Sequence, residues 1–119
     1  MSYADGFVIA IKKKNLPAYV KMAKKAGKIW REHGALEYIE CVGDDLKVEM
    51  GTPFTKLAKT TEDEVVVFSW ILYKSKAHRN AVNKKVMKDP RISSMCDPNN
   101  MPFEMKRMTY GGFKAVVEA

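Results

Sequence analysis

A histidine and two arginines are the side chains of this 119-residue chain best suited to acid–base chemistry or anion binding. His78 has a side chain that titrates near neutral pH, and it precedes Val82 and Val86 at helical spacing, on one face of an expected helix. A histidine in that position can move a proton or hold an anionic ligand. The alternative interpretation is a histidine at the edge of the core, satisfied by one hydrogen bond.

Arg79 and Arg107 offer paired N–H donors that suit a carboxylate or a phosphate. The alternative is a structural role, in which they pair with the strand residues Glu37 and Glu40. Those two glutamates lie on opposite faces of a strand, which excludes a paired-carboxylate acid–base site. His78 and Arg79 are therefore the candidate catalytic residues, and Arg107 is a candidate ligand-binding residue.

Trp70 and Tyr110 are two further candidate ligand-binding residues, because the chain has a set of aromatic side chains that could line a pocket. Aromatic residues at helix and strand spacing also form ordinary cores, and the sequence leaves both interpretations open. The set comprises Tyr19, Trp30, Tyr38, Trp70 and Tyr110.

No metal site or cofactor is predicted. Asp44 and Asp45 form an acidic pair in a glycine turn, which could bind a metal but is more typical of a solvated turn. Cys41 and Cys96 lack the spacing of zinc ligands and are interpreted as reduced thiols. The sequence contains no P-loop, GxGxxG, GxSxG or HExxH motif. With no secretory signal and no apolar run long enough to span a bilayer, a cytoplasmic location is expected.

The first half of the chain predicts a strand, a helix and a second strand. Residues 6–11 are β-branched and aromatic, as in a strand. Apolar residues then recur at steps of three and four to about His33, with Asn15 as the expected N-cap and Gly34 as the stop. Residues 35–42 form the second strand. The expected buried face of the helix consists of Leu16, Tyr19, Val20, Ala23, Ala26, Gly27 and Trp30.

The second half predicts a strand, a helix and a last strand. Residues 43–63 are a long connection, with a short strand or helical turn near Phe54 to Lys59. Residues 64–73 give the strongest strand pattern. Ser75 is expected to cap a helix over residues 76–88, which Asp89 and Pro90 end. Residues 91–104 look irregular, with a turn at 97–100. Residues 107–117 form the last strand, in which Gly111 and Gly112 indicate a bulge or a close backbone approach.

Two of the predicted strands are apolar on both faces, and this predicts a dimer. On residues 65–73 one face carries Val65, Val67, Ser69, Ile71 and Tyr73, and the other carries Val66, Phe68, Trp70 and Leu72. A strand with one face in water would alternate with polar residues. Two helices can cover one face of a four-stranded sheet, and a second copy of the chain would cover the other across a two-fold axis.

The length of the chain predicts a single domain over residues 1–119. The net charge of +7 suggests nucleic acid as a possible binding partner. RNA-recognition modules share this order of elements but carry an aromatic and basic motif on the third strand, which is absent from EVVVFSWILY. The lysines scatter along the chain, and those of the two helices follow solvent faces. Nucleic acid is therefore an unlikely partner, and non-specific RNA binding is kept as an alternative.

Several strings of this sequence resemble the YbaA-like family of uncharacterised bacterial proteins. They are HGALEY, VVFSW, AHR, VMKDPR and KRM with YGGF, and the resemblance covers nearly the whole chain. It departs from the family pattern at Lys76 and Asn80, where arginine and aspartate are usual. The family is similar in fold to the dimeric α+β barrels, whose members include cofactor-independent monooxygenases, haem-degrading enzymes and small isomerases.

The pattern and the resemblance together give one hypothesis. The chain is expected to be α+β, with a ferredoxin-like β-α-β-β-α-β order, an antiparallel sheet, two helices on one face and a dimeric α+β barrel. By resemblance, a small organic ligand would bind in a cavity between the sheet and the helices, with or without enzymatic turnover. A structural or regulatory dimer without a ligand is the other alternative.

Overall fold

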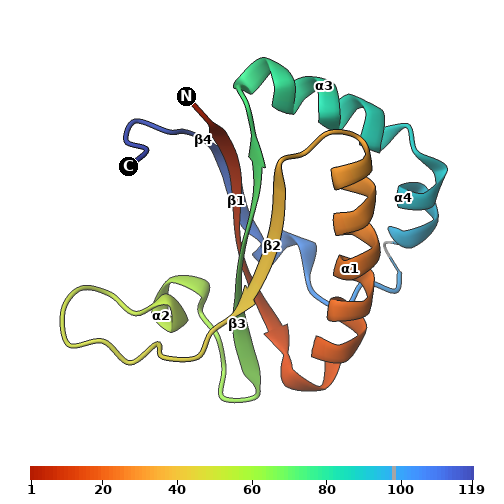
Figure 1. Cartoon of the computed structure of the whole chain (residues 1–119). Helices are drawn as coiled ribbons and strands as arrows, with labels where there is room; N and C mark the ends of the chain where they lie inside the picture. The colour runs from red at the N-terminus through yellow and green to blue at the C-terminus, as the bar shows by residue number, and fades with distance from the viewer. Residues whose placement is uncertain (98) are drawn as a thin grey trace.

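The computed structural model describes residues 1–97 and 99–119 and contains one four-stranded antiparallel sheet in the order β2-β3-β1-β4. Helices α1, α3 and α4 lie on one side of it, and the short α2 lies on the other (Figure 1). The predicted α+β class is confirmed. The elements are β1 (Tyr3–Lys12), α1 (Leu16–Glu32), β2 (Glu37–Val42), α2 (Phe54–Ala58), β3 (Glu64–Tyr73), α3 (Lys76–Met87), α4 (Pro90–Met95) and β4 (Thr109–Lys114), with 3₁₀ turns at Lys13–Asn15 and Met105–Arg107.

The central strands β1 and β3 pair along their full length, from Tyr3 opposite Tyr73 to Lys12 opposite Glu64. Their alternate residues point to the helices and form the core, as the period of a strand requires. Around Ile71 and Tyr73 the core includes Val82 and Val86 of α3, and around Ile9, Ile11 and Val67 it includes Tyr19 and Ala23 of α1. The odd-numbered residues of β3, from Val65 to Tyr73, therefore face the helices. The even-numbered residues, from Val66 to Leu72, face the other side of the sheet, which we call the open side.

Helix α1 agrees with its predicted range, but two details differ. Asn15 occupies the N-cap position without a side-chain hydrogen bond, because a 3₁₀ turn runs directly into the helix. Val20 is 38% exposed instead of buried, and Ile29 fills the core in its place. Gly34 ends the helix with φ +116°, a left-handed conformation that favours glycine.

The prediction for residues 91–104 was partly wrong, because a second short helix follows α3. Ser75 caps α3 as predicted, accepting a hydrogen bond from the backbone N–H of His78. Asp89 ends α3 and then caps α4 by accepting from the backbone N–H of Arg91. Its carboxylate also lies 2.8 Å from His33 Nε2 and so ties α4 to the end of α1. The predicted turn at 97–100 includes Pro98, which is outside the described residues.

The last strand is shorter than predicted and has no bulge. Its pairing with β1 is continuous from Thr109 to Lys114, so Arg107 precedes the strand and residues 115–117 follow it. The other prediction for the glycine pair was a close approach to the backbone. This is found at Gly112, where the side chains of Tyr3 and Arg79 lie against the strand. A Cβ atom there would overlap the Tyr3 hydroxyl and lie 2.8 Å from Arg79 Nη2.

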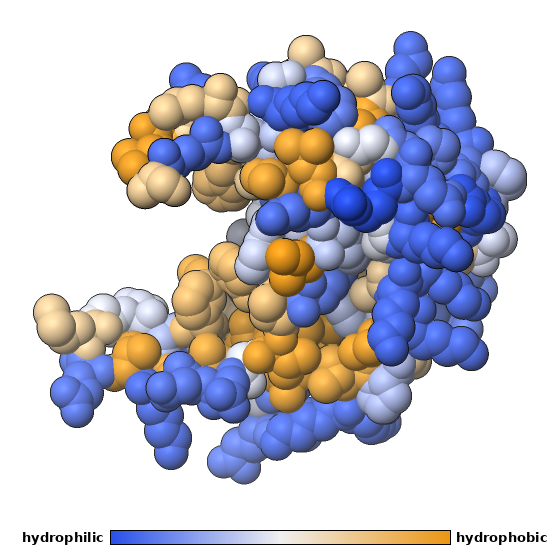
Figure 2. Space-filling view, viewed as in Figure 1, coloured by the Kyte–Doolittle hydropathy of each residue, from blue (hydrophilic) through white to orange (hydrophobic). Residues whose placement is uncertain are grey.

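The open side of the sheet is a hollow with hydrophobic walls. Figure 2 shows it between the end of the chain and the segment of residues 43–63, which we call the arm. Helix α2 of the arm covers the lower end of this face, where Val66 and Ala10 are buried. Higher up, Ile39, Phe68 and Phe113 are 37%, 43% and 64% exposed. The face without long helices is thus apolar and uncovered in the single chain.

We predict that Gly27→Ala destabilises the protein by roughly 1–3 kcal/mol, the range for overpacking a core. A Cβ at Gly27 would lie 2.6 Å from Cδ1 of Tyr38, so α1 or the Tyr38 ring must move. The free energy of unfolding in urea, followed by circular dichroism, measures the effect. Lys28→Ala, at an exposed position of the same helix, should leave it nearly unchanged, and equal stability of both variants would contradict the tight packing.

Candidate functional site

An ion pair between a buried aspartate and a partly exposed arginine joins β1 to the first turn of α3. Asp5 lies on the helix side of β1 and is 8% exposed. Arg79 extends from α3 so that its Nε lies 3.6 Å from Asp5 Oδ1. Its Nη2 donates a hydrogen bond of 2.9 Å to the Tyr3 hydroxyl, and its guanidinium carbon lies 5.0 Å from the centre of the Tyr3 ring. The guanidinium is therefore held by one carboxylate and one aromatic ring.

Among the residues that the structure describes, one donor of Arg79 has no hydrogen-bond partner. Its Nε is buried, and 3.6 Å to Asp5 is too long for a hydrogen bond. Gly112 of β4 makes room for this arrangement, because a side chain there would displace Tyr3 and Arg79. An unsatisfied buried donor is costly, so it marks a position where a ligand atom would be stabilised.

Asn83 connects this ion pair to the core. Its Oδ1 accepts hydrogen bonds from the Tyr73 hydroxyl at 3.0 Å and from Trp30 Nε1 at 3.2 Å. Burial raises the pKa of Asp5, and the Arg79 charge opposes that shift. Burial also raises the pKa of Tyr73, which keeps its hydroxyl protonated as a donor. We call Tyr3, Asp5, Tyr73, Arg79 and Asn83 the polar cluster.

His78 lies beside this cluster, with one ring nitrogen already engaged. Its Nδ1 accepts a hydrogen bond of 3.0 Å from the backbone N–H of Lys74. The neutral ring consequently carries its proton on Nε2, which faces the turn at Gly34. The ring also packs edge-on against Tyr73, with centroids 6.0 Å apart. These contacts match the alternative of a histidine at the edge of the core.

The five candidate residues from the sequence do not form one site. Tyr110 lies on the helix side of β4, where it is 67% exposed and stacks on Phe7 with ring centres 5.8 Å apart. Trp70 lies on the open side of β3 and donates to Glu37 at 3.4 Å. The sheet itself separates these two aromatics, so only His78 and Arg79 are brought together.

Arg107 lies away from the cluster and is engaged in an ion pair. Its two Nη atoms donate to the Glu64 carboxylate at 2.6 and 3.0 Å, and Nη2 also donates to the Lys59 carbonyl at 2.9 Å. The expected pairing of the arginines with Glu37 and Glu40 is not found. Glu40 instead accepts from the hydroxyls of Tyr19 and Tyr38 at 2.7 and 2.9 Å. Arg107 therefore fastens the base of the arm to β3.

Asp5, Tyr3 and Asn83 were not identified from the sequence. Asp5 carried a usable signal, since it is a lone acid in the strand YADGFVIAIK and shares a face with the apolar Phe7, Ile9 and Ile11. The predicted strand began at Gly6, which left Asp5 outside it. Asn83 gave no comparable signal, because a polar residue on a helix is usually solvated.

A groove of about 530 Å³ lies next to the polar cluster and shares Tyr3 with it. Two lysines are among its walls, and the start of α3 forms one side. The groove is lined by Met1, Ser2, Tyr3, Ser75, Lys76, Lys114, Ala115 and Val116.

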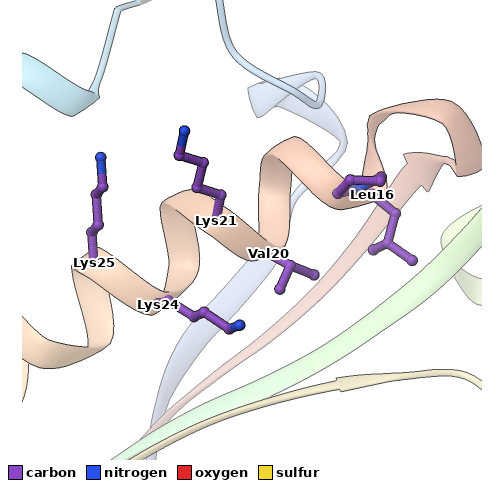
Figure 3. Close-up of a pocket in the computed structure, with 6 residues that line it drawn as sticks. Leu16, Val20, Lys21, Lys24 and Lys25 are labelled. Atoms are coloured by element: carbon purple, nitrogen blue, oxygen red, sulfur yellow. The ribbon is translucent and has the colours of Figure 1, made fainter.

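A second surface depression follows the outer side of α1 and does not form an enclosed site. Leu16 and Val20 point to one side of the helix, and Lys21 and Lys25 point to the other (Figure 3). Side chains that diverge in this way cannot surround a ligand. Within residues 1–97 and 99–119, no three metal-ligating side chains cluster, so Asp44 and Asp45 have no third partner there. Across the same residues, no helix has the length and hydrophobicity to span a membrane.

Comparison with known proteins finds relatives over the whole length of the chain. The family described as "Protein of unknown function (DUF1428)" matches residues 2–105. The uncharacterized protein YbaA of Escherichia coli K12 is 44% identical over 118 residues, which cover 99% of each chain. The uncharacterized YbaA of Shigella flexneri matches to the same extent.

Solved structures match at much lower sequence identity. An uncharacterized NIPSNAP domain protein from Burkholderia xenovorans has a TM-score of 0.58 at 14% identity, covering 98% of this chain and 97% of that one. A nipsnap family protein with unknown function from Agrobacterium tumefaciens has a TM-score of 0.57 at 20% identity, covering 96% and 87%. This likeness concerns the α+β fold alone.

We predict that the Glu64–Arg107 pair makes stability depend on pH in the acid range. The hydrogen bond from Arg107, followed by one from the Thr61 backbone, lowers the pKa of Glu64 from 4.5 to about 2. A lowered pKa in the folded state stabilises the protein above about pH 4.5, and this contribution disappears as the pH falls through about 2. The stability difference between the natural protein and Glu64→Gln should therefore shrink over that range.

Urea unfolding at a series of pH values measures this difference. Glu62→Gln, at an exposed neighbouring position, is the control and should show no comparable change with pH. A Glu64→Gln difference that stays constant from pH 7 to pH 2 would contradict the role of the ion pair.

Proposed function

The chain belongs to the DUF1428 family of proteins of unknown function, and we propose that it works as a homodimer that binds a small organic anion beside the polar cluster. The observation that carries the ligand proposal is the buried Arg79 Nε, which has no hydrogen-bond partner within residues 1–97 and 99–119. In this proposal the fold is a ferredoxin-like, dimeric α+β barrel of one domain. The free thiols of Cys41 and Cys96 support a cytoplasmic location.

The homodimer follows from the open side of the sheet. Its strand positions alternate with those of the core, yet they are apolar and include the exposed side chains of Ile39, Phe68 and Phe113. On the open side of the sheet, the charged strand residues are Lys12, Glu37 and Glu64, which lie toward the ends of their strands. A second copy meets such a face with an equally apolar and nearly uncharged surface, which is what a two-fold interface needs.

The anion site follows from the charges around the groove. Lys76 and Lys114 contribute positive charge at its walls, and Tyr3 connects it to the Arg79 guanidinium. A carboxylate or phosphate entering beside Tyr3 would find a fork of N–H donors that is only partly occupied. Turnover of such a ligand would depend on Asp5 or His78 for proton transfer, because Asp5 pairs with Arg79 and His78 precedes it in α3.

Non-specific RNA binding is the second candidate function. The aromatic side chains of the open face favour it, and the distribution of the lysines does not. Phe68, Trp70 and Phe113 could stack on bases. Backbone phosphates, however, need cations nearby, and the lysines of α1 lie on the other side of the sheet. A face with two glutamates and one lysine is a poor binding surface for a polyanion. A second copy of the chain therefore fits this face better than RNA does.

We predict that Phe68→Glu combined with Phe113→Glu converts the dimer to a monomer, because two charges would be buried at the interface. Sedimentation velocity at micromolar concentration measures the assembly. Tyr110→Glu is the matched control, since Tyr110 is 67% exposed on the opposite side of β4 and Phe113 is 64% exposed. The control should remain dimeric, and a natural protein that is monomeric in this experiment would disprove the dimer.

We predict that inorganic phosphate or benzoate raises the melting temperature of the natural protein and fails to do so in Arg79→Gln. Ligands that bind only the folded state stabilise it by mass action, and the variant lacks the guanidinium that would hold them. Lys85→Gln, an exposed lysine of the same helix, controls for net charge and should keep the shift. Chloride at equal ionic strength controls for general salt effects.

Native mass spectrometry of gently purified protein provides an independent readout. A dimer with extra non-covalent mass would identify the ligand directly. A bare dimer, with equal melting temperatures in phosphate and chloride, would favour a structural or regulatory dimer and contradict the anion site.

A further inference from the structure

The arm exposes more hydrophobic surface than a solvated loop requires. Met50 is 89% exposed, Leu57 is 59% exposed and Val48 is 50% exposed. Loops of soluble proteins usually carry polar residues at such positions, and a cluster of exposed apolar side chains indicates a contact surface. Figure 1 shows the arm extending away from the sheet, on the side opposite to α1, α3 and α4.

The arm is fastened at its base, and its tip projects. At one end the Gly43 N–H donates to the Val66 carbonyl at 2.8 Å. At the other end Arg107 donates to the carbonyl of Lys59, and the Lys13 N–H donates to that of Asp63 at 2.9 Å. Phe54 packs edge-on against Phe68, with ring centres 5.9 Å apart. The base is thus continuous with the open face of the sheet, while residues 44–52 extend beyond it.

The charge of the tip is opposite to that of the rest of the chain. Residues 44–52 contain three acids, Asp44, Asp45 and Glu49, and one lysine, Lys47, which gives a charge of 1 − 3 = −2. The whole chain carries +7, so the remainder carries 7 + 2 = +9. The net charge of the tip and that of the rest of a second copy therefore have opposite signs, which favours their association at long range.

We propose that the arm of each protomer packs against the second copy, so that the two arms clasp the dimer from both sides. This inference rests on the proposed homodimer and adds a second contact region to it. The contact between Phe54 and Phe68 joins the arm to the open face. A partner seated on the open face meets the arm next, and Val48, Met50 and Leu57 become buried against it.

Limited proteolysis with trypsin tests this contact in the natural protein. Lys47 and Lys56 lie on the arm and are exposed in the single chain. Above the concentration at which the dimer forms, cleavage at these lysines should be at least about tenfold slower than in the same protein diluted to a monomer, since a packed loop must open before it is cut. Cleavage at Lys85 of α3 serves as the internal reference.

The double variant Met50→Ser, Leu57→Ser tests the energetics of the same contact. Both side chains are exposed in the single chain, so its circular dichroism and its fold should be unchanged. The dissociation constant of the dimer should rise roughly tenfold or more, as expected for losing two buried apolar side chains. Met87→Ser is the matched control, because Met87 of α3 is 59% exposed, as Leu57 is.

The outcomes separate this inference from the proposed dimer. A dimer whose arm is cut as fast as that of the monomer, with an unchanged dissociation constant in the double variant, would overturn the clasp and leave the dimer standing. A natural protein that is monomeric at every concentration would overturn both. The clasp is supported if the arm of the natural dimer is cut more slowly than that of the monomer, and if the dimer is weaker in the double variant but unchanged in Met87→Ser.

Discussion

The pairing of β1 with β3 is the constraint on which the rest of this structure depends. Both strands are ten residues long, and they pair from Tyr3 opposite Tyr73 to Lys12 opposite Glu64. Because both carry apolar side chains on each face, this pairing creates two hydrophobic surfaces. Helices α1 and α3 bury one of them and form the core. The other surface stays largely open in the single chain, where the short α2 covers its lower end.

The same register decides where the polar groups lie. Asp5 points to the helix side and would be an isolated buried charge without Arg79. The arginine reaches it only because Gly112, on the neighbouring strand, leaves space for the guanidinium and for Tyr3. Asn83 then satisfies the hydroxyl of Tyr73 and the indole of Trp30. A network of this kind specifies how α3 packs, and the proposed ligand site rests on Arg79 Nε, which has no hydrogen-bond partner among the described residues.

The similarity to NIPSNAP proteins is consistent with this interpretation and adds no chemistry to it. At 14% and 20% identity it concerns the path of the backbone. The proposed function rests instead on side chains of this chain, which form the polar cluster, the open face and the acidic arm. Two of them, the open face and the arm, meet at the contact between Phe54 and Phe68. The proposed assembly and the position of the arm therefore depend on the same contact.

The sequence by itself determined the elements that depend on neighbouring residues. The bounds of β3, the course of α1 with its stop at Gly34, and the Ser75 cap of α3 were all predicted, because periodicity and capping are local. It also predicted that the central strands have two apolar faces.

Only the tertiary structure decided which side chains meet. The period of a strand tells which residues share a face, but not which face receives the helices, so Trp70 and Tyr110 were assigned to one pocket although the sheet separates them. Arg107 pairs with Glu64 rather than with Glu37 or Glu40, and Asp5 pairs with Arg79, because the fold brings together residues that are far apart along the chain. Such contacts depend on register and on the packing of α3, and no local pattern encodes either of them.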